Sequence, residues 1–192
     1  VGRGVKHQRW AWEHLAAGLD GVVYAAEQDS GTIVVLPVVG TPTILAKGFQ
    51  GVKTLALIGA GEIVANLQRY VSSSTPAPRI VRIKPDVGTV WEKPGTSGGG
   101  LCIDADGRTY VTAFSALPTE PQGYDLREGA SRMNGIAAVD TEGNFTRLSG
   151  YVLGFAPERL ALSPDQTVLF CSSIQRPDIL CWQIQPDGSV KH

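Results

Sequence analysis

Three cysteines and three histidines are the first candidates for chemistry in this 192-residue chain. Cys102, Cys171 and Cys181 include no CxxC pair, so neither a zinc knuckle nor a dithiol redox motif is expected. All three lie in apolar stretches, which favours buried, reduced thiols. Of the histidines, only His14 adjoins an acidic residue, Glu13. No serine has the context of a nucleophile elbow, so the sequence does not support a nucleophilic triad.

Two glycine-containing motifs resemble ligand loops but are better interpreted as hairpin turns. The segment Ile58-Gly-Ala-Gly-Glu-Ile-Val64 begins like a dinucleotide fingerprint, which needs a small residue where Val64 stands and a helix after it. Asp104-Ala-Asp-Gly107 begins like a calcium loop but lacks the later ligands and the closing glutamate. Both motifs therefore predict turns between strands.

Short strands must position whatever site the chain has. The chain contains 23 glycines and 12 prolines, which separate short runs rich in β-branched residues. Turns that combine Pro, Asp and Gly recur at an interval that gives four strands in roughly 40 to 50 residues, the period of a propeller blade. This spacing predicts an all-β propeller with about four blades, and a β-sandwich is the alternative. The expected strands cover 21–27, 31–36, 43–46, 55–58, 62–65, 79–83, 89–91, 100–104, 109–113, 136–139, 145–148, 159–162, 167–171 and 178–184.

Three segments depart from this pattern. Residues 10–17 could form two helical turns or an outer strand. Residues 72–78 are a connector rich in Pro and Ser, and 116–133 form a long polar loop, a class of segment that often carries function.

Composition excludes several classes of protein. Apolar residues make up 43% and charged residues 18%, which excludes a disordered chain and allows one core-forming domain over residues 1–192. The formal net charge is −1 and no basic run occurs, so nucleic acid is not an expected partner. No stretch is long and apolar enough for a membrane span, and no signal peptide is visible. We expect a cytoplasmic protein, although a mature secreted chain would look the same.

Four motifs, in order, carry a resemblance to a known family. The segments 101–113 (LCIDADGRTYVTA), 135–143 (GIAAVDTEG), 157–165 (PERLALSPD) and 179–188 (ILCWQIQPDG) are similar to the blade motifs of the senescence-marker protein/gluconolactonase/luciferin-regenerating enzyme family. The resemblance implies a six-bladed β-propeller, of which this chain covers about four blades. A partner chain, or a second copy of the same chain, would then complete the ring.

The resemblance also implies a divalent cation, usually calcium, in the central channel. A first-blade Glu, Asn residues on later blades and an Asp would hold it, since oxygen ligands suit a hard cation. In this chain the first-blade position has Glu13 as its candidate, and the later positions carry Gly99, Glu158 and Ser172. Glu13 and Glu158 are therefore the expected metal ligands, and Ser172 is the candidate for a catalytic or polar neighbour.

Three functions follow as hypotheses. The first is a hydrolase that acts on a small lactone or ester in the channel, where the cation polarises the carbonyl and a carboxylate assists water. The second is a metal-independent biosynthetic enzyme, either a cyclase or isomerase or a condensing enzyme similar to strictosidine synthase. The third is a binding scaffold without catalysis.

Overall fold

A computed structural model describes most of the chain. The described residues are 12–18, 20–27, 30–59, 61–67, 79–94, 99–113, 135–149, 157–173 and 177–191. The connector 72–78 and the polar loop 116–133 lie outside these ranges, so the functional expectation for the loop stays a prediction.

The described residues form four antiparallel sheets of four strands each, in chain order. Sheet A contains β1 (Trp12–Ala17), β2 (Val23–Glu27), β3 (Thr32–Leu36) and β4 (Thr43–Ala46). Sheet B contains β5 (Val52–Ile58), β6 (Glu62–Leu67), β7 (Arg79–Lys84) and β8 (Gly88–Pro94). Sheet C contains β9 (Leu101–Ile103), β10 (Thr109–Ala113), β11 (Gly135–Val139) and β12 (Phe145–Arg147). Sheet D contains β13 (Pro157–Leu162), β14 (Val168–Ser173), β15 (Ile179–Ile184) and β16 (Val190–Lys191).

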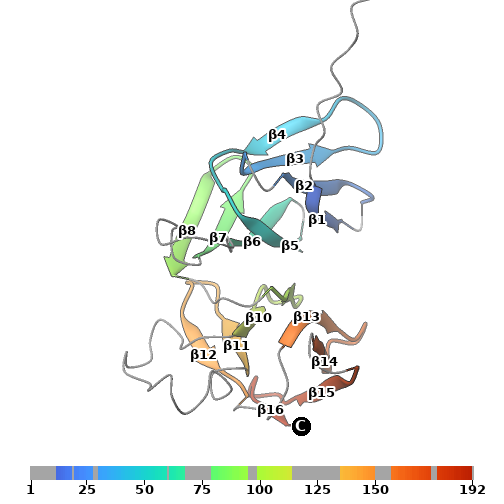
Figure 1. The fold of residues 1–192 in the computed structure, drawn as a ribbon, viewed down its shortest axis with the longest axis vertical. Coiled ribbons are helices and arrows are strands. Elements are labelled where there is room, and N and C mark those ends of the chain that lie inside the picture. Colours follow the sequence, from blue (N-terminus) through green and yellow to red (C-terminus); the bar gives the residue numbers. More distant parts are fainter. Residues whose placement is uncertain are drawn as a thin grey trace, which may run out of the picture.

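The sheets follow one another around the molecule as propeller blades (Figure 1). The first strand of each sheet contacts the first strand of the next, so β1, β5, β9 and β13 are the inner strands. Apolar clusters fill the spaces between successive blades: Ile33 meets Ile63 between sheets A and B, and Tyr110 meets Trp182 between sheets C and D. This arrangement confirms the propeller prediction and excludes the sandwich.

Side chains of aspartate build the hairpin turns. Asp104 Oδ1 accepts hydrogen bonds from the backbone N–H groups of Asp106, at 3.1 Å, and Arg108, at 2.9 Å. Asp140 Oδ1 does the same for Glu142, at 3.0 Å, and Asn144, at 2.8 Å. Each turn therefore closes within its own sequence, as turn chemistry predicts.

The motif that resembles a dinucleotide fingerprint is also a hairpin, which joins β5 to β6. Gly59 and Gly61 have φ angles of 54° and 88°, a region that glycine adopts without strain. No helix occurs in the described ranges, and none of their segments could cross a membrane as a helix.

The helical alternative for residues 10–17 is wrong, because 12–17 form strand β1. Pairing with β2 satisfies the backbone of this segment, whereas a helix of two turns is unstable by itself. The strand is also an inner strand rather than an outer one, since it packs against β5.

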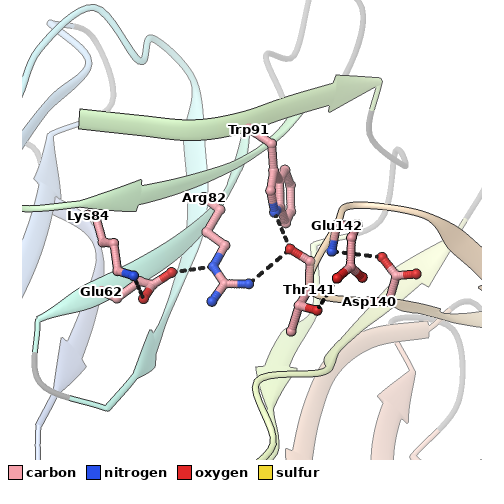
Figure 2. A network of polar contacts seen from close by, with 7 residues as sticks. All are labelled: Glu62, Arg82, Lys84, Trp91, Asp140, Thr141 and Glu142. Atoms are coloured by element: carbon pink, nitrogen blue, oxygen red, sulfur yellow. Dashed lines mark hydrogen bonds and ion pairs between the residues drawn. The ribbon is translucent and has the colours of Figure 1, made fainter. Parts of the chain in front are cut away.

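A polar network joins sheet B to the turn of sheet C. Arg82 pairs through Nε with the Glu62 carboxylate and donates from Nη1 to the Thr141 carbonyl at 3.1 Å. Trp91 Nε1 donates to the same carbonyl at 3.0 Å, and Lys84 Nζ lies 3.5 Å from Glu62 Oε2. Figure 2 shows Arg82 between the carboxylate and the turn. The network fixes the position of one blade relative to the next.

Candidate functional site

Charged side chains from the inner strands β5 and β13 meet near a histidine of a third inner strand, β1. Lys53 of β5 has its Nζ 3.9 Å from Glu158 Oε1 of β13, and Arg159 Nε lies 4.0 Å from the same oxygen. The positive charge of Arg159 also reaches His14 of β1. We call His14, Lys53, Glu158 and Arg159 the axial cluster.

Irregular strand pairing places these residues. In β5, Val52 pairs with Leu67 and Thr54 with Asn66, so Lys53 is an extra residue in the register. A shift in β13 between Pro157 and Leu160 leaves one extra residue among Glu158 and Arg159, and β1 shifts in the same way at Glu13. Bulges of this kind redirect side chains and are frequent beside active sites.

Two glycines leave room for the cluster where β9 begins. A Cβ added at Gly99 would lie 2.8 Å from Lys53 Cε and 3.0 Å from its Nζ, so the lysine stem occupies the space of a side chain at 99. A Cβ at Gly100 would lie 2.8 Å from the Glu158 carbonyl oxygen. The Thr54 hydroxyl donates to the Gly99 carbonyl and holds β5 against this segment.

His14 is a neutral hydrogen-bond donor in this setting. Its Nδ1 accepts a hydrogen bond from the Leu55 N–H at 3.1 Å, so the proton of the neutral ring is on Nε2. Burial, reinforced by the charge of Arg159, lowers the pKa of His14. The imidazole therefore stays uncharged at neutral pH and can donate from Nε2.

The two carboxylate oxygens of Glu158 differ in their contacts. Its Oε1 faces both Lys53 and Arg159. Its Oε2 is buried and has no hydrogen-bond partner among the described residues. Since a carboxylate oxygen can accept more than one hydrogen bond, Oε2 is an acceptor for a water molecule or a substrate hydroxyl.

The thiol nearest to the cluster is unreactive. Burial raises the pKa of Cys171 to about 12, and the negative charge of Glu158 acts in the same direction. The thiol stays protonated at neutral pH and is not a nucleophile. The sequence interpretation of this cysteine as a buried thiol is confirmed.

The expected site residues divide into three cases. Glu158 lies in the axial cluster, whereas the side chain of Glu13 lies outside what the structure describes. Ser172 lies on β14, one strand further from the axis, and its carbonyl accepts a hydrogen bond from the Cys171 thiol at 3.3 Å. No contact in the described residues joins its hydroxyl to the cluster, and its catalytic role stays a prediction.

Lys53 and Arg159 are not among the site residues that the sequence predicts. In the sequence, Lys53 precedes the strand expected over 55–58, whereas the structure extends this strand to Val52–Ile58 and so includes it. A single charged residue beside Val52 is a weak signal, since alternate residues of a strand often face solvent.

The surroundings of Glu158 do not fit a divalent cation. Lys53 and Arg159 already face its Oε1, and a cation added there would meet two like charges. Across the described ranges, no group of three or more His, Cys, Asp or Glu side chains converges. The metal assignment of Glu13 and Glu158 stays a prediction, and we derive no chemical step through a metal.

Solved propeller structures are similar to this fold. A streptogramin B lyase has a TM-score of 0.65 at 16% identity, over 95% of this chain and 54% of that one. A gluconolactonase from Xanthomonas campestris has a TM-score of 0.64 at 16% identity, over 94% of this chain and 60% of that one. A virginiamycin B lyase from Staphylococcus aureus has a TM-score of 0.65 at 17% identity, over 96% of this chain and 56% of that one.

These similarities establish the β-propeller fold. The chain spans between 54% and 60% of the length of these three proteins. No model of a known protein family and no curated protein sequence matches it.

Proposed function

We propose that this chain forms part of a propeller enzyme, similar to gluconolactonases, that hydrolyses an ester or lactone at the axial cluster. The buried Oε2 of Glu158 carries the proposal, because it is a proton acceptor without a hydrogen-bond partner among the described residues, while Oε1 of the same carboxylate faces two cationic side chains. Ester hydrolysis needs this combination: an acceptor for the proton of water, and donors for the oxygen that becomes negative.

The chemical steps use described groups. A water molecule held by Glu158 Oε2 attacks the carbonyl carbon, and its proton passes to the carboxylate. We assign the stabilisation of the resulting oxyanion to donors of the axial cluster, including His14 Nε2–H, since the ring is neutral and its Nδ1 is occupied by the Leu55 N–H. The carbon–oxygen bond to the leaving group then breaks, and Glu158 returns the proton to the leaving alkoxide. The products are a carboxylic acid and an alcohol, joined in one molecule when the substrate is a lactone.

The neighbouring thiol does not offer a competing route. Cys171 lies beside Glu158, yet burial keeps it protonated, so a thioester intermediate is not part of the proposal. Attack by water that a carboxylate activates remains the chemistry that this cluster can support.

A panel of lactones and simple esters tests the proposal on the full chain, with acid release followed by a pH indicator. We expect at least one substrate to be hydrolysed, and Glu158→Gln to lower kcat by roughly 10²–10⁴-fold, the usual contribution of a general base. The matched control is Glu92→Gln on β8, which removes a carboxylate that pairs with Arg79 away from the axis. Circular dichroism and Tm show whether each variant is folded.

Two results would contradict the proposal. One is a Glu158→Gln variant that hydrolyses the substrate as fast as the Glu92→Gln control. The other is the absence of hydrolysis across the panel while a member of it binds the cluster, which would favour the binding scaffold or the metal-independent biosynthetic enzyme instead.

A further inference from the structure

Lys53 lies between two positions at which the family resemblance places ligands of a divalent cation. One position falls at or near Gly99, where an added Cβ would lie 3.0 Å from Lys53 Nζ. The other is Glu158, whose Oε1 is 3.9 Å from the same nitrogen. The ammonium group therefore occupies the region between them, and only 13% of the lysine side chain is exposed.

Two local features of the structure accommodate the side chain of Lys53. The register shift in β5 adds Lys53 as an extra residue and so directs it away from the regular pairing of the strand. The residue at 99 is a glycine, and any side chain there would meet the lysine stem. A solvent-exposed lysine would require neither feature.

We propose that the ammonium group of Lys53 takes the place of a divalent cation and polarises the carbonyl oxygen of the substrate. This inference rests on the proposed hydrolysis. An ammonium group is a point charge with three donors, so its contact with Glu158 engages only part of its donor capacity. In a partly buried site such a charge stabilises a developing oxyanion more strongly than it would in water.

The binding test does not depend on turnover. Calcium chloride is titrated into the full chain by calorimetry, and Tm is measured with calcium and with a chelator. We expect no binding that depends on Glu158 and no change in Tm, whereas a site filled at a hundredfold excess over Kd would raise Tm by several degrees. Saturable calcium binding that Glu158→Gln abolishes would overturn the proposal. Calcium binding that Glu158→Gln leaves unchanged would take place at another site and would agree with the proposal.

The catalytic test uses two substitutions of the lysine, assayed with the chelator present. Lys53→Met removes the charge and keeps the stem, and should lower kcat by about 10²–10³-fold with less effect on KM, as for the loss of an oxyanion donor. Lys53→Arg keeps a positive charge and should retain part of the rate. Lys47→Met, an exposed lysine just after β4, is the control and should leave kcat unchanged.

Equal kcat values for Lys53→Met and Lys47→Met would overturn the proposal. If the whole panel of esters proves inert, the proposed hydrolysis fails, and the calcium titration still decides whether the lysine has replaced a metal site.

Discussion

Lys53 Nζ lies 3.9 Å from Glu158 Oε1, and this contact joins the second blade directly to the fourth. The third blade lies between them in the chain, but its inner strand β9 begins only at Leu101, directly after Gly99 and Gly100. The small residues at that point let side chains from the flanking blades meet across it.

Gly99 and Gly100 should respond differently to substitution by alanine. At Gly99 the new Cβ meets the far end of a flexible lysine, which can move aside. Gly99 is buried, but only a flexible side chain must shift, so we expect Gly99→Ala to change the free energy of unfolding by less than about 1 kcal/mol while it displaces Lys53 and lowers any hydrolytic rate. Urea unfolding and the ester assay measure the two effects.

At Gly100 the new Cβ would lie 2.8 Å from the Glu158 carbonyl oxygen and 3.1 Å from the Leu160 N. Backbone atoms of β13 cannot move aside cheaply, so Gly100→Ala should lower the free energy of unfolding by about 1–3 kcal/mol, as for an overpacked core. Equal stability of the two alanine variants in urea would show that the packing at β9 is looser than the structure indicates.

The ion pair between Arg82 and Glu62 should contribute more to stability than a surface pair. Both side chains are largely buried, at 13% and 11% exposure, and Arg82 also donates to the turn of sheet C. Arg82→Met leaves the Glu62 carboxylate with Lys84 alone, and should lower the free energy of unfolding by about 2–3 kcal/mol, somewhat below the cost of breaking a fully buried pair.

Arg79→Met is the matched control for this network. Arg79 pairs with Glu92 at 2.6 Å, but the two side chains are 31% and 39% exposed, and exposed pairs contribute about 0–1 kcal/mol. Urea unfolding compares the two arginine variants. Adding Glu62→Gln to Arg82→Met should recover part of the loss, because it removes the carboxylate left with one partner. Similar losses for Arg82→Met and Arg79→Met would contradict the importance of this contact between blades.

His14 should make the chain less stable in mild acid. Its pKa is lowered in the folded state, chiefly by burial, so the unfolded chain takes up a proton first as the pH falls below about 6.5. The stability that neutral His14 contributes to the folded chain is therefore fully present above the pKa of this histidine in the unfolded chain. It is lost as the pH falls toward the lower pKa in the folded chain. Unfolding of wild type and His14→Gln between pH 8 and pH 5 isolates this effect, since other groups titrate in both proteins. A stability difference that is independent of pH would refute the assignment.

The three thiols should differ in reactivity. Cys181 is exposed, whereas burial raises the pKa of both Cys171 and Cys102. Ellman's reagent at pH 8 should label one thiol of the native chain rapidly and all three in denaturant. Cys181→Ser should remove the rapid phase. Rapid labelling of a second native thiol would show that the blades open around one of the buried cysteines.

The sequence singles out Glu158 through its place in the PERLALSPD segment, and the structure puts this residue on the inner strand β13, in the axial cluster. Its predicted role as a metal ligand stays a prediction. Lys53 was not expected there, because nothing in the residues around it distinguishes it from a lysine that faces solvent. Its position depends on the extra residue in β5, and that irregularity exists only relative to β6.

The sequence by itself determined most of the strands, the hairpin turns and the blade architecture, but it left β1 open between helix and strand and did not include β16. These features depend on interactions within a few residues, such as the hydrogen bonds of Asp104 and Asp140 to their own turns, and neighbouring residues are enough to specify them. Only the tertiary structure decided which charges meet at the axis. Lys53 and Glu158 come together through shifts in strand register and through the absence of a side chain at Gly99, and both depend on contacts between segments that are distant in the chain.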